Sequence, residues 1–232
     1  MGLRTFLGLK KKRAEVMPFP TLEGFSQLHQ DSWVVSETHG KRGGFFVEIG
    51  AFNGTTLSNS LLLERDYGWS GILVEPSPTF TIPILSTRKA KLCTQPVDSQ
   101  SGNSVTMLFV TEKPEISSIN RVANNDRNAE QRKRDHVEIE MQTISLMDLL
   151  VKFNAPKVID YISIDTEGNE FDILESFDFQ RFDIQLFSIE HNFTEAEAKL
   201  DNLMKKNGYE RVFKDVTKFD AWYRKLLENG RT

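Results

Sequence analysis

The sequence predicts an α/β protein built on an open, doubly wound sheet of mostly parallel strands. Short apolar runs with strand character alternate with segments of helical character along most of the chain. Two of these runs, Phe45–Ile49 and Val158–Ile164, are rich in β-branched and aromatic residues, as expected for strands covered on both faces. The 232 residues show no internal repeat, so we expect one continuous domain.

The first half of the chain carries the clearest strand, helix, strand unit. Residues 55–65 are predicted to form its helix, because Leu57, Leu61 and Leu62 recur at helical spacing. The length of the unit fits a right-handed crossover between parallel strands. The predicted strands of this half are residues 45–49, 72–74, 92–97 and 105–110.

The second half is predicted to continue the alternation and to close with an antiparallel hairpin. Ser145 can cap a helix whose apolar stripe ends before Pro156. Thr194 and Glu197 form a capping box for a later helix that ends at Gly208. The other predicted elements are strands at residues 158–164 and 184–189, a short helix at 170–177, and a hairpin of residues 209–214 and 219–224.

Two segments stand apart from this alternation. Residues 1–24 are predicted to be a solvated tail with a basic cluster at residues 10–13, which leaves residues 25–232 as the folded domain. Residues 111–135 are polar and lack apolar periodicity. A long segment of this kind is expected to be either a lid over a substrate site or a mobile, disordered loop.

Composition and charge narrow the class of protein. Lys and Arg number 29 against 33 Asp and Glu, a net charge of −4, which argues against a general nucleic-acid-binding protein. The single cysteine, Cys93, excludes internal disulfides and multi-cysteine zinc or iron–sulfur sites. Neither a signal peptide nor a transmembrane segment is recognisable, so we expect a cytoplasmic protein.

Glycines and acidic residues follow the predicted strands at the positions where α/β sheets bind ligands. After the first strand, Gly50 and Gly54 allow a tight turn into a helix whose N-terminal N–H groups can bind an anion. Glu75 ends the second strand, where a carboxylate can accept hydrogen bonds from both hydroxyls of a ribose. Asp98 either binds an adenine amino group or is a polar turn residue. The pattern indicates an adenosine-containing ligand.

Two separated motifs carry a resemblance to a known family. The first is GFFVEIGAFNG at residues 44–54, followed by VEP at residues 74–76. The second is ISIDTEGNE at residues 162–170, which matches a D-x-E-G-x-E signature and is followed by IEH at residues 189–191. Over about residues 25–224, the chain resembles the FkbM-type family of S-adenosylmethionine-dependent methyltransferases.

The resemblance implies a Rossmann-like class I methyltransferase fold, whose seven-stranded, mostly parallel sheet ends in an antiparallel hairpin. It also implies S-adenosylmethionine as the cofactor and methyl transfer to oxygen. Glu75 would bind the ribose and Asp98 the adenine edge, while Asp165 would hold the cofactor amino group or orient an acceptor hydroxyl. The residues implied around the methionine part of the cofactor are Glu48, Gly50, Ala51 and Gly54.

Three residues are candidates for the general base that removes the hydroxyl proton, namely His191, Asp165 and Glu167. His191 has the ordinary pKa nearest neutrality and follows a strand. Glu167 and Glu170 can instead stabilise the N-terminus of the next helix. Asp165, Glu167 and Glu170 could also hold a divalent cation, although nothing in the sequence requires a metal.

The predicted function is therefore O-methylation of a hydroxyl on a sugar, glycan, lipid or secondary metabolite. Basic residues of the polar segment could attract an anionic acceptor, although acidic neighbours nearly cancel their charge; they are Arg121, Arg127, Arg132, Lys133 and Arg134. A nicotinamide oxidoreductase is disfavoured, because the glycine spacing differs and no Tyr-x-x-x-Lys pair occurs. The alternative from another class is a non-catalytic protein that uses the fold as a binding or scaffold module.

Overall fold

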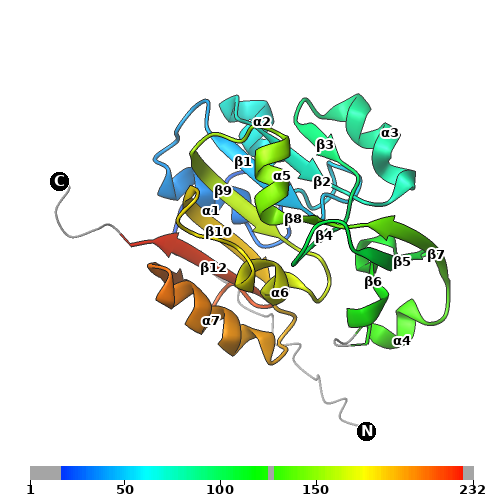
Figure 1. The fold of residues 1–232 in the computed structure, drawn as a ribbon. Helices are drawn as coiled ribbons and strands as arrows, with labels where there is room; N and C mark the ends of the chain where they lie inside the picture. Colours follow the sequence, from blue (N-terminus) through cyan, green and yellow to red (C-terminus); the bar gives the residue numbers. More distant parts are fainter. Residues whose placement is uncertain (1–16, 125–127, 227–232) are drawn as a thin grey trace, which may run out of the picture.

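The computed structural model describes residues 17–124 and 128–226, and its main feature is a seven-stranded sheet (Figure 1). The strand order is β11-β12-β10-β9-β1-β2-β3. In this sheet β12 runs antiparallel to β10 and β11, and the other pairings are parallel, which confirms the predicted fold. The strands are β1 (Phe45–Ile49), β2 (Ser70–Val74), β3 (Lys91–Cys93), β9 (Val158–Ile164), β10 (Asp183–Glu190), β11 (Tyr209–Val212) and β12 (Asp220–Lys225).

Helices cover both faces of the sheet. Successive side chains of a strand point to opposite faces, so each strand contributes to two hydrophobic cores, one on each face. On β1, Phe46 packs in one cluster with Trp33 and Val47 packs in the other with Leu149. The helices around the first cluster are α1 (Gln30–Glu37), α2 (Leu61–Tyr67) and α3 (Pro78–Thr87), and those around the second are α5 (Leu146–Lys152), α6 (Glu170–Glu175) and α7 (Ala196–Lys206).

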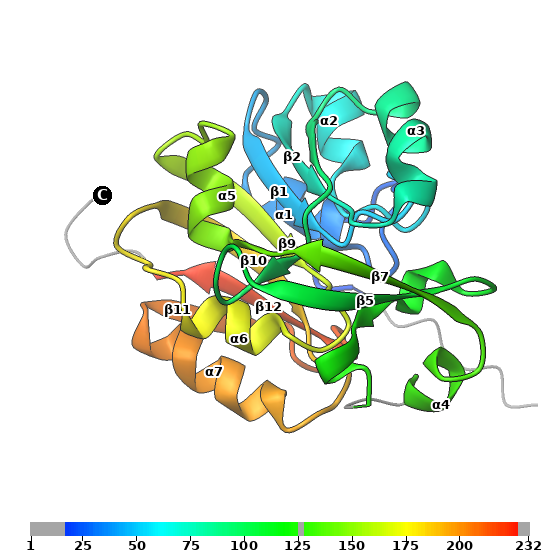
Figure 2. The ribbon, with the colours of Figure 1, turned by 45° about the vertical axis from the view of Figure 1, so that its right-hand side comes forward.

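The chain between β3 and β9 builds a second, three-stranded sheet in the order β6-β5-β7, which Figure 2 shows beside the main sheet. β5 pairs antiparallel with both of its neighbours, whereas the short β4 and β8 pair with each other in parallel. The elements of this region are β4 (Val97–Asp98), β5 (Ser104–Val110), η1 (Pro114–Ile116), β6 (Ser118–Ile119), η2 (Asn120–Val122), α4 (Ala129–Arg132), β7 (His136–Gln142) and β8 (Ile144–Ser145).

The segment predicted as a lid or a disordered loop, residues 111–135, lies largely within this second region. Arg132 anchors it, because its fully buried guanidinium donates to the carbonyl oxygens of Ile116 (2.5 Å) and Ala123 (3.1 Å). The same guanidinium donates to Glu167 Oε2 at 2.7 Å. Residues 125–127, which include Arg127, lie outside the described residues.

The predicted helix at residues 55–65 begins only at Leu61, and the buried side chain of Glu48 explains the difference. The carboxylate of Glu48 accepts hydrogen bonds from Ser58 Oγ (3.0 Å) and from the backbone N–H of Asn59 (2.6 Å). These bonds hold the residues before Leu61 as a loop around the carboxylate. The helical spacing of the leucines therefore did not decide where the helix begins, because the buried carboxylate of Glu48 needs hydrogen-bond donors from the preceding residues.

The two predicted helix caps have different outcomes. Ser145 Oγ accepts the backbone N–H of Asp148 at 3.1 Å, which confirms the cap of α5. The prediction of a capping box at the start of α7 is wrong, because the Glu197 carboxylate bonds to Arg211 Nη1 at 2.7 Å instead of to the backbone. Arg211 lies on β11, so a tertiary ion pair replaces the local bond.

Within the segment that the sequence predicted as a tail through residue 24, Phe19 packs on the domain. The buried Phe19 ring lies 5.5 Å from the ring of Phe213 and 6.0 Å from that of Trp222. Residues 1–16, with the basic cluster, lie outside the described part of the chain. Among the helices of residues 17–124 and 128–226, none combines the length and the apolar character needed to cross a membrane.

Candidate active site

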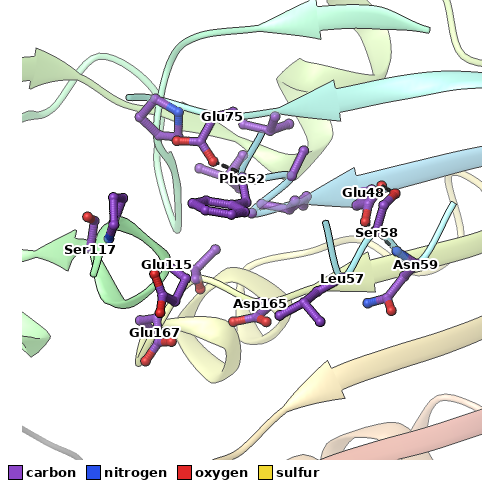
Figure 3. Close-up of a pocket in the computed structure, with 18 of the residues that line it drawn as sticks. Glu48, Phe52, Leu57, Ser58, Asn59, Glu75, Glu115, Ser117, Asp165 and Glu167 are labelled. Atoms are coloured by element: carbon purple, nitrogen blue, oxygen red, sulfur yellow. Dashed lines mark hydrogen bonds between the residues drawn. The ribbon is translucent and has the colours of Figure 1, made fainter. Parts of the chain in front are cut away.

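A pocket opens at the carboxyl ends of β1, β2 and β9, which is where ligands bind in doubly wound sheets (Figure 3). Gly50, Glu75 and Asp165 follow these three strands and line it. The small sheet and its loops supply a second wall, and the N-terminal segment together with the start of β12 supplies a third. Lining residues of these two walls include Met107, Phe109, Glu115, Ser117, Ile119, Gln27, Gln30 and Asp220.

Gly50 allows the ends of the three strands to meet. Its N–H and that of Ala51 both donate to the carbonyl oxygen of Val74 at 3.0 Å, and the N–H of Asp165 donates to Ile49 at 3.0 Å. Gly50 has φ +87°, and a Cβ on this residue would lie 1.9 Å from the carbonyl oxygen of Asp165. Only glycine fits this turn, so no side chain of residue 50 lies between the backbone and the pocket.

Glu75 presents a fixed carboxylate to the pocket. Its Oε2 accepts the N–H of Phe52 and its Oε1 accepts the N–H of Ser77, both at 2.8 Å. Each oxygen retains a lone pair that can accept a further hydrogen bond. Burial raises the pKa of Glu75 to about 7, against which the two backbone N–H groups act.

Glu48 and Gly54, both predicted around the methionine part of the cofactor, hold the turn in shape. The carboxylate of Glu48 lines the pocket but is occupied by Ser58 and Asn59, as described above. The carbonyl oxygen of Gly54 accepts Arg88 Nη1 at 2.7 Å, and the buried Arg88 guanidinium lies 3.8 Å from Glu48 Oε2. Gly50 and Ala51 line the pocket directly.

Asp98 lies beside the pocket lining, with its carboxylate engaged by protein donors. The guanidinium of Arg121 bonds to it, the N–H of Ser99 donates to it at 2.8 Å, and Asn169 Nδ2 donates at 3.4 Å. Asn169 and Val97 line the pocket at this point. The amide Oδ1 of Asn169 is buried and has no hydrogen-bond partner among the described residues.

Asp165 faces the pocket from the end of β9, and Figure 3 shows it among the other acidic side chains. Burial raises its pKa to about 7, and the negative charges of Asp220 and Glu170 act in the same direction. Asp220 accepts Gln30 Nε2 at 2.6 Å, and burial raises its own pKa to about 6. The two carboxylates therefore face the same cavity from opposite parts of the chain.

The other two candidate bases differ in their access to the pocket. Glu167 lines it and is bonded to Arg132. His191 is buried outside the lining, where its Nδ1 accepts the N–H of Phe193 at 3.1 Å and its Nε2 lies 3.1 Å from the carbonyl oxygen of Asp220. Burial lowers the pKa of His191. Both ring nitrogens are thus used in holding two loops together.

Several pocket residues were not found from the sequence. Gln27 and Gln30 come from the N-terminal segment, and Asp220 comes from the start of the antiparallel β12. The signal for Asp220 was its position: the first residue of an antiparallel strand lies at the same edge as the last residues of its parallel neighbours. Glu190 is paired with Asp220 across β10 and β12 and was also missed.

Three carboxylates near the pocket could hold a metal ion. One oxygen from each of Asp165, Glu170 and Glu190 lies within 4.8 Å of the others. The sequence had suggested a different trio, with Glu167 in place of Glu190. The structure brings Glu190 into the group because it ends β10 directly beside the end of β9.

The strand order and the strand-end pocket define the class of protein. A mostly parallel seven-stranded sheet that ends in an antiparallel strand is the fold of class I methyltransferases. A family profile described as "Methyltransferase FkbM domain" matches residues 48–230, and the chain belongs to the FkbM methyltransferase family. A search of curated protein sequences found no match to this chain.

Solved structures resemble the fold at low sequence identity. The METTL16 MTase domain is 12% identical with a TM-score of 0.50, over 87% of this chain and 68% of that one. The precorrin-6y C5,15-methyltransferase of Geobacter metallireducens GS-15 is 10% identical with a TM-score of 0.44, over 88% and 91%. A point mutant of MtNAS is 12% identical with a TM-score of 0.40, over 83% and 57%.

Proposed function

We propose that this protein transfers a methyl group from S-adenosylmethionine to a hydroxyl oxygen of its acceptor. The observation that carries the proposal is the Glu75 carboxylate, which two backbone N–H groups hold at the end of β2. A carboxylate in this position can accept hydrogen bonds from both ribose hydroxyls of the cofactor. Family membership supports the same cofactor.

The remaining cofactor contacts follow from the surroundings of Glu75. Gly50 and Ala51 would contact the methionine part through their backbone, while Glu48 and Gly54 would act by shaping the turn. The adenine would lie along Val97 and Asn169, which line the pocket beside Asp98. Asp98 would then orient Asn169 through the 3.4 Å bond to its amide.

The charge of the pocket supports a cationic cofactor and narrows the acceptor. Among the described residues, those that line the pocket include no Lys, Arg or His, whereas its acidic members are Glu48, Glu75, Glu115, Asp165, Glu167 and Asp220. Glu48 and Glu167 lie beside the basic side chains of Arg88 and Arg132, so the excess negative charge comes from the other four carboxylates. It grows as pH rises through the raised pKa values of Glu75, Asp165 and Asp220, and it attracts sulfonium and ammonium groups and repels phosphate. We therefore expect an uncharged or cationic hydroxyl compound among sugars, glycans, lipids and secondary metabolites.

Three of the basic residues considered for an anionic acceptor, namely Arg121, Arg132 and Lys133, are engaged elsewhere. Arg121 pairs with Asp98 and Asp172, and Lys133, which directly follows α4, pairs with Glu130 on that helix. Arg132 is buried against Glu167. Their charges are balanced locally, which is consistent with an acceptor that carries no phosphate.

Asp165 is the group best suited to receive the hydroxyl proton. Methyl transfer from a sulfonium is an in-line displacement, so much of the rate comes from holding the hydroxyl oxygen against the methyl carbon. The pKa of Asp165, about 7, suits a proton acceptor near neutral pH. Glu167 shares its carboxylate with Arg132, and His191 would have to give up a backbone bond to act.

Calorimetric titration of the full chain with S-adenosylmethionine, S-adenosylhomocysteine and NAD tests the cofactor. Saturable binding of the first two and none of NAD is expected. Glu75→Ala should weaken binding about 10- to 100-fold, because it removes two hydrogen bonds to a charged group. Glu175→Gln, on the exposed end of α6, is the matched control and should bind normally. Equal affinity of Glu75→Ala and the control would overturn the ribose assignment.

Incubation with methyl-labelled S-adenosylmethionine then tests the transfer itself. Matched neutral, amino and phosphorylated sugars serve as acceptors, together with lipid and glycan fractions. Label in a neutral or amino compound is expected, and label only in phosphorylated compounds would contradict the acceptor class. Cofactor binding with no labelled product from any hydroxyl compound would favour a non-catalytic binding module.

A further inference from the structure

A group of three carboxylates reaches from the pocket wall into the protein. Asp165 lines the pocket, whereas Glu170 and Glu190 are buried behind it and are only 4% and 8% exposed. The ends of β9 and β10 bring two of them together, because Ile164 and Ile189 are direct partners in the sheet. The first residue of α6 supplies the third.

The carboxylate of Glu190 stands out among these buried acids because one of its oxygens is unpaired. Its Oε2 is buried without any hydrogen-bond partner in the described part of the chain. By contrast, Glu170 Oε1 accepts the N–H of Thr166 (2.8 Å), the hydroxyl of Thr166 (3.0 Å) and the N–H of Gly168 (3.1 Å). The Glu190 carboxyl shares a side-chain hydrogen bond with Asp165, which still leaves Oε2 buried without a donor, and a buried carboxylate oxygen of this kind is costly.

The group also lacks a neutralising basic side chain among the residues that the structure describes. Across residues 17–124 and 128–226, neither Lys nor Arg forms an ion pair with Asp165, Glu170 or Glu190. Burial raises the pKa of all three carboxyls, and for Asp165 and Glu190 the charges of neighbouring carboxylates act in the same direction. Two partners can relieve such a group: protons shared between the carboxyls, or a cation bound by them.

We propose that Asp165, Glu170 and Glu190 bind a divalent cation of the Mg²⁺ or Mn²⁺ type at the inner wall of the pocket. Ligand oxygens within 4.8 Å of one another can surround one such ion, because metal–oxygen distances of about 2.1–2.5 Å put opposite ligands ~4–5 Å apart. Hard cations prefer carboxylate oxygens, and the sites of Mg²⁺ usually keep open positions for water or substrate.

The position of the ion gives it a role in acceptor binding. Asp165 belongs both to the group and to the pocket lining, so open coordination positions would face the cavity. An acceptor hydroxyl could occupy one of them and be oriented beside the second oxygen of Asp165. This role rests on the proposed function, whereas the cation site itself does not.

Cation binding is measured on the full chain without cofactor, after treatment with EDTA. Titration with MnCl2, MgCl2 and CaCl2 is followed by calorimetry and, for Mn²⁺, by the loss of the free-ion EPR signal. One ion per chain is expected, with affinity rising between about pH 6 and about pH 8 as the ligands lose their protons. Absence of saturable binding of all three cations at about pH 8 would overturn the proposal in favour of shared protons.

Two variants locate the site. Glu190→Gln should weaken Mn²⁺ binding about 10- to 100-fold. Glu175→Gln, exposed at the far end of α6, should bind as the wild type does. Equal Mn²⁺ affinity of the two variants would overturn the assignment to Glu190.

Thermal unfolding provides a second measurement in case Glu190→Gln changes the stability of the protein as well as its Mn²⁺ affinity. In EDTA, Glu190→Gln should unfold at the same or a higher temperature than the wild type, because it removes an unpaired buried charge. Mn²⁺ should raise the unfolding temperature of the wild type and not that of the variant. A Mn²⁺-dependent rise of equal size in both proteins would contradict the proposal. S-adenosylmethionine binding is measured separately, so the two proposals fail independently.

Discussion

The carbonyl oxygen of Asp165 lies where a side chain at Gly50 would begin, 1.9 Å from the position of a Cβ. Gly50 follows β1 within the glycine motif, Asp165 follows β9 and begins the acidic motif, and the parallel pairing of β1 with β9 joins them. The contact joins the carboxyl ends of β1 and β9 at the pocket. We therefore expect any side chain at residue 50 to destabilise the protein.

Gly50→Ala should destabilise the protein by about 4 kcal/mol, because the ends of β1 and β9 must separate to admit the methyl group. Gly102→Ala is the matched control: Gly102 also has positive φ, +80°, but nothing lies within 4 Å of its Cβ position. The control should cost only about 1 kcal/mol, which is the strain of the backbone conformation alone. Urea unfolding measures both, and equal losses would contradict a steric role for Gly50.

Asp165→Asn should make the protein more stable and less active. The folded-state pKa of Asp165, about 7, is above its ordinary value, so the folded protein holds this proton more tightly than the unfolded chain. The stabilising effect of that proton is complete below about pH 4 and is lost as pH rises through about 7. The variant should therefore gain about 1–3 kcal/mol at about pH 8 and little at about pH 4, measured in EDTA.

The pH dependence of the stability gain distinguishes loss of the Asp165 charge from a change in side-chain packing. A gain of equal size at both pH values would show that the charge of Asp165 is not the cause. Asp172→Asn, on the outer side of α6 in an ion pair with Arg121, is the matched control. It should lose a few tenths of a kcal/mol at about pH 8, because exposed ion pairs contribute little.

His191→Asn should affect stability more than catalysis. The amide oxygen of Asn can replace Nδ1 as the acceptor for Phe193, but the contact of Nε2 with Asp220 is lost. We expect a loss of about 1–2 kcal/mol of stability. The rate should stay within about 10-fold and the pH–rate profile should keep its shape, whereas Asp165→Asn should lose at least about 100-fold. The reverse order of losses would make His191 the base.

The sequence predicted the residues that follow parallel strands, because topology alone puts them at one edge of the sheet. Glu75 and Asp165 line the pocket for this reason. It did not predict Asp220 and Gln30, which reach the same edge from an antiparallel strand and from the N-terminal helix. The predicted hairpin could have indicated Asp220, which begins its second strand, whereas the position of Gln30 depends on how the N-terminal helix packs, for which the chain has no local signal.

The charged character of residues 111–135 was misleading for a physical reason. Arg132 looks like a solvated residue in a run of charges, yet its guanidinium is fully buried because two carbonyls and a carboxylate surround it. The β5–β7 ladder that frames this segment pairs residues far apart in sequence, such as Val110 with His136. Neither the buried bonds nor the ladder leaves a periodic pattern in the sequence.

Arg132→Met should loosen the small sheet without unfolding the domain. The substitution keeps an apolar side chain in the buried site but removes the guanidinium bonds to Ile116, Ala123 and Glu167. We expect local opening to become easier by about 3 kcal/mol, because a buried ion pair is broken on one side only. Hydrogen exchange of the amides in residues 114–123 should accelerate, while exchange in β1 and β9 should not change.

The kinetic consequence follows from which wall the small sheet forms. Glu115 and Ser117 line the pocket from this region, whereas Gly50 and Glu75 belong to the main sheet. Arg132→Met should therefore raise KM for the acceptor by more than it raises Kd for the cofactor. Lys133→Met, which removes an exposed pair with Glu130, should change neither constant. If Arg132→Met weakened cofactor binding and acceptor binding equally, the small sheet would be part of the cofactor site rather than the wall on the acceptor side.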